Sequence, residues 1–549
     1  SRRKRAFSAK VVSVWGKMCY DSSGKKTDLC RKIPGGEKGI IRFMRKKSFW
    51  NRRFTRSRVR SEKVQLPEML FGYILGPMGA MVSGSIFTSI LQSYFTDVLR
   101  LDLRFLTRLQ LVSTVLIVLA NLVMGQLIEH TRALAGKARP WLLLSAFTLS
   151  AACVLMFIVP FRGTARMVWI AIAYNLYYAF ASPIYSTAST IMISVSTRDS
   201  RQRGLLASIN SMMGLGVMGV CSMVFPMLVS FALKDDLNRW FLTMLGVAVF
   251  TGATIYLQFA YTRERVTEER QIMAGLLGPE GEFEAAKAEE NRQAQPEPPA
   301  AEVPEVTLLQ QVKAVTSDRM WWVIMIFYLL FQWSGALKNG TMTYYCKWVV
   351  DNTFLGSAGA WGASQSLLTM MGALPMTAAS ALLLPLSNKY GKRKVCGVCL
   401  LAGAAGGVIA GLGQGRLIPV AAGVALKCFG SAPACYLIVA MVADVIDHVE
   451  YRTGIRTDGF TMSVYSSLAV ASAPVANAAF SAALARAGYD QQANVALGTA
   501  AQSAAVQQVI SAGYIWAETV CYVVAGILLL VFWTVENDLE KERETFTKQ

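Results

Sequence analysis

Long apolar blocks alternate along this chain with short polar connections, many of them basic. A block such as 109–128, LQLVSTVLIVLANLVMGQLI, can cross a hydrocarbon core of about 30 Å as a helix that rises 1.5 Å per residue. Twelve blocks of this kind predict twelve membrane-spanning helices. They lie near residues 68–95, 107–129, 141–160, 167–192, 205–233, 240–261, 320–346, 358–385, 395–413, 417–444, 459–485 and 508–534.

One long polar stretch, residues 262–319, divides the twelve spans into two groups of six. It contains the run QAQPEPPAAEVPEV, whose Pro and Glu content is typical of a flexible linker. The loops after the second and the eighth span, GQLIEHTRALAGKARPW and PLSNKYGKRK, both combine a Gly-Lys turn with further basic residues. Two halves with corresponding basic loops predict an all-α membrane protein with the major facilitator fold.

Five regions follow from this reading. They are a basic tail at 1–66, a six-helix bundle at 67–261, the linker at 262–319, a second bundle at 320–534 and a short tail at 535–549.

Composition supports a membrane protein over the soluble classes. Hydrophobic residues make up 53% of the 549 residues and charged residues 16%, against about a quarter in globular chains. This excludes a soluble enzyme, a disordered chain and a small disulfide-rich domain. Neither GxxxxGK[ST], HExxH nor GxSxG occurs, and no metal-ligand spacing stands out, so we expect no catalytic residues, no metal and no cofactor.

The net charge of +20 is concentrated at the N-terminus. Residues 1–66 carry 21 Lys or Arg and four acids, which gives +17 and leaves +3 for the rest. A basic flank before the first span predicts that both termini and the linker are cytoplasmic, in the inner membrane. The tail shows no nucleic-acid-binding module, and its basic residues suit lipid head groups. Met44 is a plausible start of the protein, so we expect 1–43 to be upstream sequence or a dispensable extension.

Several motifs resemble one known family. They are QSYFTDVL (92–99), GQLIEHTRALAGKARPW (125–141), TRDSRQRGLL (197–206), LKNGTMTYYCKWVVD (337–351), NKYGKRK (388–394) and ADVIDHVEYRTGIRTDGFTMSVYS (443–466). The chain is similar, over about 68–534, to the glycoside–pentoside–hexuronide:cation symporters, the melibiose-carrier branch of the major facilitators.

The resemblance implies transport of a sugar or sugar derivative by alternating access, with H⁺ or Na⁺ as a co-transported ion. The charged residues that the family uses for the cation and the sugar are replaced here. Their positions hold Met81, Ile117, Asn121, Ala181, Asn210 or Ser211, and Val470. Na⁺ coupling and galactoside recognition therefore do not carry over.

Two lysines lie at membrane depth, where a charge costs at least about 2.5–3.5 kcal/mol. Lys427 lies ten residues into its span, and Lys338 lies in SGALKNGT, where Gly335 and Gly340 are expected to interrupt the helix. With no carboxylate nearby, the two lysines favour an anionic solute such as a uronide. The alternatives are that Lys338 bonds to carbonyls of a broken helix, and that Lys427 snorkels or pairs with Glu518.

Sugars are held by hydrogen bonds and by aromatic faces, which gives further candidates beside the lysines. Packing or interfacial anchoring is the alternative role for each of them. The expected substrate-binding set is Lys338, Lys427, Asn339, Gln332, Trp333, Tyr174, Asn175, Tyr178, Gln92 and Asn121.

Charged residues in the cytoplasmic loops are expected to form a gate of ion pairs between the halves, or to act only as topology determinants. These residues are Glu129, Arg132, Arg139, Asp444, Asp447, Arg452 and Arg456.

The sequence thus predicts a secondary transporter of a sugar or uronide, not an enzyme, in contact with the lipid bilayer and with no nucleic-acid partner. The coupling ion stays open, with H⁺ transfer through Glu518 as one option. The alternatives are an uncoupled facilitator, a carrier of lipid-like anions, and a sensor on a transporter scaffold.

Overall fold

The computed structural model describes residues 57–59, 61, 64–129, 131, 136–197, 200–234, 236–268, 308–356, 360–455 and 457–535. Within these ranges the chain is helical apart from short connections. The predictions about residues 1–43, most of the N-terminal tail, the centre of the linker and the C-terminal tail lie outside the described residues.

Six spans form the N-terminal half, and single turns of π-helix, labelled η, interrupt three of them. The first span is α4 (Leu66–Glu68), η3 (Met69–Leu75), α5 (Gly76–Ser93) and η4 (Tyr94–Val98); the next are α6 (Leu103–Glu129) and α7 (Arg139–Phe157); the fourth is α8 (Thr164–Asn175), η5 (Leu176–Ala181) and α9 (Ser182–Ser196); the last two are α10 (Ser200–Leu228) with η6 (Val229–Leu233), and α11 (Leu237–Tyr261).

The C-terminal half repeats this arrangement after a short helix, α14. Its elements are α14 (Leu308–Thr316), α15 (Arg319–Trp348), the 3₁₀ turn η7 (Thr353–Leu355), α16 (Trp361–Tyr390), α17 (Lys392–Leu412), α18 (Leu417–Thr453), α19 (Asp458–Ala487), the 3₁₀ segment η8 (Val495–Ala501), and a twelfth span of α20 (Ala504–Ser511), η9 (Ala512–Trp516), α21 (Ala517–Ile527) and η10 (Leu528–Phe532).

Each of the twelve predicted spans coincides with one of these long helices. Eleven of them are long and apolar enough to cross a membrane; the other is α16, a 30-residue helix with Pro375 and Pro385 inside it. The stretch 262–319, expected to be a linker throughout, contains α14 at its C-terminal part.

The expected break in the seventh span is wrong, because α15 is one continuous helix of 30 residues. Gly340 instead allows close packing: a Cβ on it would lie 2.3 Å from Oδ1 of Asn477 in α19. Local changes from α-helix to π-helix occur instead in the first and the fourth span, where Pro77 follows η3 and Pro183 follows η5. Proline removes a backbone donor from the ladder, which is a common cause of such a distortion.

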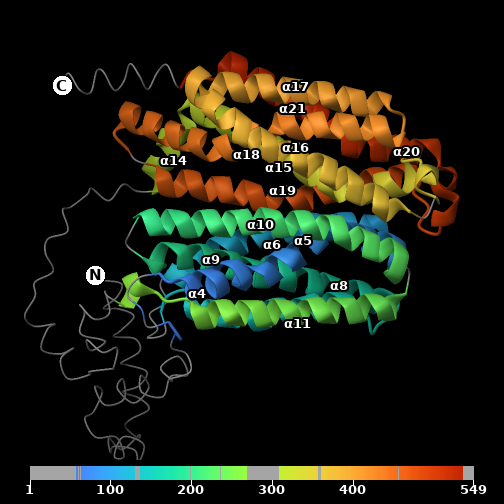
Figure 1. Ribbon diagram of the computed structural model, residues 1–549, viewed down its shortest axis with the longest axis horizontal. Helices are drawn as coiled ribbons and strands as arrows, with labels where there is room; N and C mark the ends of the chain where they lie inside the picture. The colour runs from blue at the N-terminus through green and yellow to red at the C-terminus, as the bar shows by residue number, and fades with distance from the viewer. Residues whose placement is uncertain are drawn as a thin grey trace, which may run out of the picture.

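The two halves lie side by side as two bundles (Figure 1). The N-terminal half, blue to green, forms the lower bundle in this view, and the C-terminal half, yellow to red, forms the upper one. Helices α4 and α14 lie at one end of the molecule and α20 at the opposite end. We call these the α14 end and the α20 end.

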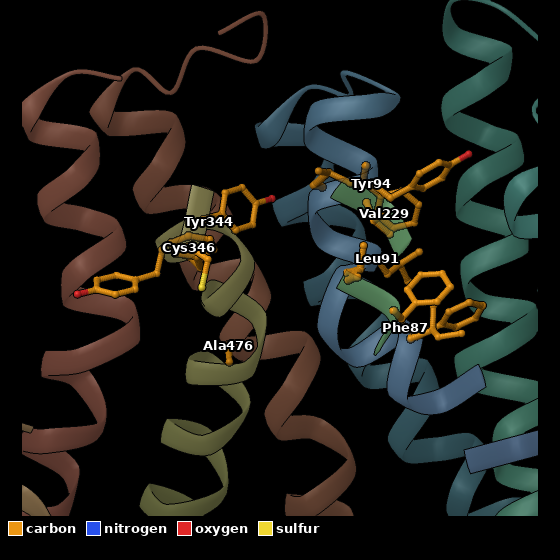
Figure 2. Packing of buried hydrophobic residues seen from close by; sticks show 14 of the residues in the cluster. Phe87, Leu91, Tyr94, Val229, Tyr344, Cys346 and Ala476 are labelled. Atoms are coloured by element: carbon orange, nitrogen blue, oxygen red, sulfur yellow. The ribbon is translucent and has the colours of Figure 1, made fainter. Parts of the chain in front are cut away.

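The hydrophobic core is shared between the halves toward the α20 end and separate toward the α14 end. The largest buried cluster includes Tyr94 and Phe95 of the first span together with Tyr344 of α15 and Phe480 of α19. Figure 2 shows this region, with Tyr344 and Cys346 on α15 opposite the first span. Three further clusters each lie within one half, two in the C-terminal half and one in the N-terminal half.

The largest of these separate clusters contains Trp321 of α15 together with Val442 and Val449 of α18, in the C-terminal half. The cluster of the N-terminal half contains Leu142 of α7 together with Met192 and Phe259. The halves are therefore joined at one end, while each bundle has its own core at the other.

Candidate functional site

Three charged side chains meet inside the C-terminal half. Nζ of Lys427 lies 2.7 Å from Oε2 of Glu518, and Nζ of Lys338 lies 3.1 Å from Oε1 of the same carboxylate. The side chains of Lys427 and Glu518 are each 1% exposed, whereas that of Lys338 is 21% exposed. We call these three residues the charged triad; α15, α18 and α21 contribute one each.

The local winding of the twelfth span holds Glu518 in place. The π turn η9 ends at Trp516, and the backbone carbonyl of Tyr514 within it accepts a hydrogen bond of 3.3 Å from Nζ of Lys427. Tyr522 lies one turn beyond Glu518, and its hydroxyl donates to Oε1 at 2.6 Å. The carboxylate is thus bonded by Tyr522 of its own helix and by the two lysines, while η9 anchors Lys427 through the carbonyl of Tyr514.

The triad corrects one premise of the sequence analysis. Both lysines were expected at membrane depth without a carboxylate nearby, and Glu518 contacts both. The alternative that paired Lys427 with Glu518 describes the structure. The three ionised groups sum to one positive charge rather than two.

A second polar cluster joins the two halves at the α20 end. Nζ of Lys347 in α15 lies 2.5 Å from Oδ2 of Asp97 in the first span and donates to Oγ of Ser93 at 2.7 Å. The hydroxyl of Tyr489, after α19, donates to Oδ1 of Asp97 at 2.8 Å. The ring of Trp361 lies 4.7 Å from Nζ of Lys347, a cation–π contact. We call this the α20-end latch.

Further hydrogen bonds continue the latch toward the centre. The hydroxyls of Thr96 and Tyr344 lie 2.6 Å apart, and Thr343 donates to the carbonyl of Ser89 at 2.8 Å. Gln92 donates to Oγ of Ser481 in α19 at 2.6 Å. The first span is therefore tied to α15 and α19 over about three turns.

The sequence analysis missed Asp97 and Lys347 as functional candidates. Both lie near the ends of their spans, where a charge is normally assigned to the interface. The available signal was their position inside two of the motifs, QSYFTDVL and LKNGTMTYYCKWVVD.

Gln332 and Asn339 lie on the face of α15 that contains Thr343, three turns and one turn before it. Since Thr343 bonds to Ser89 of α5, this face points toward the N-terminal half. Asn339 is exposed and Gln332 is partly exposed, although both lie within a membrane span. The contact between the halves therefore loosens on the α14 side of Thr343.

The other substrate-binding candidates are dispersed. The rings of Tyr174 and Tyr178 lie 4.6 Å apart in the N-terminal half, and Tyr174 is buried there. Asn121 and Asn175 each donate to a carbonyl four residues earlier in their own helix, at 2.9 Å. Trp333 packs against the shared core.

The gate candidates of the N-terminal half include one well-defined side chain. Arg139 is buried, donates to the carbonyl of Phe259 at 3.0 Å and lies 4.8 Å from the centre of that ring. The carboxylate of Glu264 accepts hydrogen bonds from the backbone amides of Lys137, Ala138 and Arg139. Arg132 and the side chain of Glu129 lie outside the described residues.

The gate candidates of the C-terminal half form pairs within that half. Asp444 lies 2.5 Å from Nζ of Lys392, and Arg452 donates to Asp318 at 3.0 Å. Asp447 is partly buried, and Arg456 lies outside the described residues. A gate of ion pairs between the halves stays a prediction.

Asp318 is an acid at the α14 end that the sequence analysis did not single out. Its Oδ1 accepts from the amides of Met320 and Trp321 at 2.7 and 3.1 Å, which caps α15, and Nε2 of His448 lies 3.4 Å from Oδ2. Burial alone would raise the pKa of Asp318, but the hydrogen bonds and the charge of His448 outweigh it and lower that pKa.

Comparisons with known proteins identify the family of this chain. The family described as MFS/sugar transport protein matches residues 72–277 and 283–536. An isoprimeverose transporter of Lactiplantibacillus pentosus is 25% identical over 84% of this chain and 88% of its own length. A putative 2,3-dihydroxypropane-1-sulfonate exporter of Escherichia coli (strain K12) is 23% identical over 70% of this chain and 76% of its own length.

The fold agrees with that of solved transporters. A bacterial homologue of the human lysosomal transporter Spinster aligns with a TM-score of 0.57 and 11% identity, over 87% of this chain and 99% of that one. The family match, the resemblance to the glycoside–pentoside–hexuronide:cation symporters and the two six-helix bundles all agree. The chain is a multi-pass membrane protein that belongs to the MFS/sugar transport protein family of the major facilitators.

Proposed function

We propose that this protein is a secondary transporter that moves a sugar or sugar derivative by alternating access, with the conformation described here closed at the α20 end. The observation that carries the proposal is the asymmetry of the halves. They share a core and the latch at the α20 end, whereas each has its own core at the α14 end. Two bundles joined at one end can rock about a site between them.

The solute site that we propose lies between the halves on the α14 side of Thr343. Asn339 and Gln332 supply amides there, and Gln92, which bonds to Ser481, borders the site on its α20 side. We propose Tyr178 as an aromatic contact from the other half. Oε1 of Gln110 and Oγ of Ser113 in α6 are buried and have no hydrogen-bond partner in the described part of the chain. Such atoms suit the hydroxyl groups of a sugar, because a buried polar atom gains most from a new partner.

We further propose that the α14 end faces the cytoplasm of a cell whose inner membrane holds the protein. The 21 Lys or Arg residues of the segment before the first span support this orientation. Labelling of single cysteines placed in the tail and at Gln414, an exposed position between α17 and α18, from the two sides of intact cells tests it. Tail labelling from outside would reverse the orientation.

Proteoliposomes loaded by rapid dilution test the transport proposal. We expect uptake of at least one member of a panel of isoprimeverose, lactose, D-glucuronate and 2,3-dihydroxypropane-1-sulfonate, above liposomes without protein. Collapse of accumulation by a protonophore would show coupling, and equilibration without accumulation would show a facilitator. Failure to move any sugar or sugar acid, by protein that elutes as a single folded species, would contradict the proposal.

A further inference from the structure

The charged triad contains one carboxylate for two lysines, so its charges do not balance. Two lysines share a single carboxylate, so one positive charge remains after Glu518 has paired with both. An excess charge inside a bilayer is expensive, and such residues mark solute or ion pathways. The protein therefore retains a cationic site at a cost in stability, which calls for a functional reason.

The two lysines differ in access to solvent. Lys427 is enclosed, bonded to Glu518 and to the carbonyl of Tyr514, with its Nζ 5.6 Å from the ring centre of Tyr514. Lys338 is partly exposed and precedes Asn339, which is exposed. Lys427 thus anchors Glu518, and Lys338 is the side chain that an incoming group can reach.

Among the described groups of this cluster, the carboxylate of Glu518 is the one that a proton can neutralise. The charged and titratable groups that face it are Lys338 of α15, Lys427, Cys428 and Cys435 of α18, Tyr514 of η9, and Tyr522 and Cys521 of its own helix. None of these is a second carboxylate. In the described part of the chain, a proton entering this cluster has Glu518 as its carboxylate acceptor.

We propose that Glu518 couples proton uptake to the binding of an acidic, hydroxylated solute, a proposal that rests on the transport function above. In the unloaded site the carboxylate of Glu518 neutralises one lysine charge. When a proton from solution binds Glu518, Lys338 loses its partner and its ammonium group binds the carboxylate or sulfonate of the solute. The solute anion replaces the carboxylate charge, so the site keeps a net charge of +1 through the exchange.

This mechanism differs from the expectation raised by the sequence alone. Two lysines without a carboxylate would bind an anion at any pH. With Glu518 between them, the solute anion competes with the ionised carboxylate of Glu518 for Lys338, so anion binding weakens when Glu518 loses its proton. A neutral sugar supplies no charge to Lys338 and gains nothing from the proton. The solute class is therefore a sugar acid or a hydroxylated sulfonate, and the coupled ion is H⁺.

The experiment measures binding and proton uptake together on the full-length protein in detergent. Probes are D-glucuronate, 2,3-dihydroxypropane-1-sulfonate and the neutral control D-glucose, with a pH indicator in weakly buffered solution. We expect the affinity for an acidic probe to fall about tenfold per pH unit as pH rises, with net uptake of protons on binding. D-glucose should give neither effect.

Variants decide whether Glu518 is the acceptor. In Glu518→Gln, acid binding should become independent of pH and proton uptake should be lost, while exchange of solute for solute across a membrane continues. The double variant Lys427→Met/Glu518→Gln removes one charge of each sign, so the site keeps a net charge of +1. We expect it to show the same pH-independent binding and the same loss of proton uptake as Glu518→Gln. It therefore tests the proposal even if the single variant misfolds. Asp236→Asn, at an exposed cap of α11, is the matched control and should behave as the unmodified protein.

Two results would overturn the inference while transport stands: proton uptake that persists in both Glu518 variants, or transport confined to neutral sugars. Absence of all solute movement in the unmodified protein would instead remove the function on which the inference rests. Lys338→Gln adds a further arm, and undiminished affinity for the acidic probes in that variant would contradict the role given to the lysine.

Discussion

Single residues show both what the sequence allowed us to predict and where it stopped. Lys338 and Lys427 stood out because an apolar span rarely contains a charge. Their shared partner could not be assigned, because Glu518 lies in another span and pairing depends on how α15, α18 and α21 pack. Asp97 and Lys347 were overlooked for a different reason, namely that a charge near a span end also fits an interfacial position.

Asp318 leads to a prediction at this scale. Asp318→Asn keeps most of the cap on α15 but removes the negative charge beside His448 and Arg452. We expect a loss of about 1 kcal/mol at pH 7, seen as a lower thermal midpoint in detergent. Because the folded-state pKa of Asp318 is lowered, its stabilisation is complete above the unfolded value near ~4 and is lost as pH falls through the folded one.

The difference between Asp318→Asn and the unmodified protein should therefore shrink as pH falls below about 4. Asp236→Asn, the cap of α11 at an exposed position, serves as control and should change the midpoint less. An equal loss in Asp318→Asn at neutral and at acid pH would show that the charge is not the cause.

At the scale of elements, sequence patterns located the helices well and their distortions poorly. All twelve predicted spans coincide with long helices, and eleven of these helices in the described part of the chain are long and apolar enough to cross a membrane, because length and hydropathy are local properties. The break expected in α15 was inferred from Gly335 and Gly340, and neither interrupts the helix. The role of Gly340 depends on Asn477, which belongs to α19 and is distant in the sequence.

The two glycines of α15 form a matched pair for experiment. A Cβ on Gly335 meets open space, whereas one on Gly340 would clash with Oδ1 of Asn477. Gly335→Ala should be neutral or stabilising by up to about 1 kcal/mol, since alanine favours a helix. Gly340→Ala should cost about 1–3 kcal/mol by overpacking and reduce uptake. Equal thermal midpoints for the two variants would contradict the close packing of α15 on α19.

At the scale of the whole molecule, the sequence predicted two six-helix halves but not the conformation. The spacing of spans and the matching basic loops determine the topology. Which end is closed depends on contacts between distant segments, such as α6 with α19 and α10 with α16. Those contacts change during a transport cycle, so a single sequence is compatible with both arrangements.

A reversible cross-link tests the closed α20 end. The hydroxyl of Thr107 in α6 donates to the carbonyl of Ala478 in α19 at 3.5 Å, across the boundary between the halves. Thr107→Cys/Ala478→Cys should form a disulfide under mild oxidation and abolish uptake, and a reductant should restore it. Each single cysteine variant is the control. Full uptake by protein shown to be cross-linked would mean that the α20 end does not need to open.

The separate cores at the α14 end carry a consequence for how the polypeptide is assembled. Each bundle packs its own interior there from residues of one half, and the segment 269–307, which lies outside the described residues, connects the halves in the sequence. Two polypeptides, one ending and the other starting within that segment, are therefore expected to insert independently. They should then find each other through the surfaces around Thr96 and Tyr344, and rebuild a working carrier without a peptide bond between them.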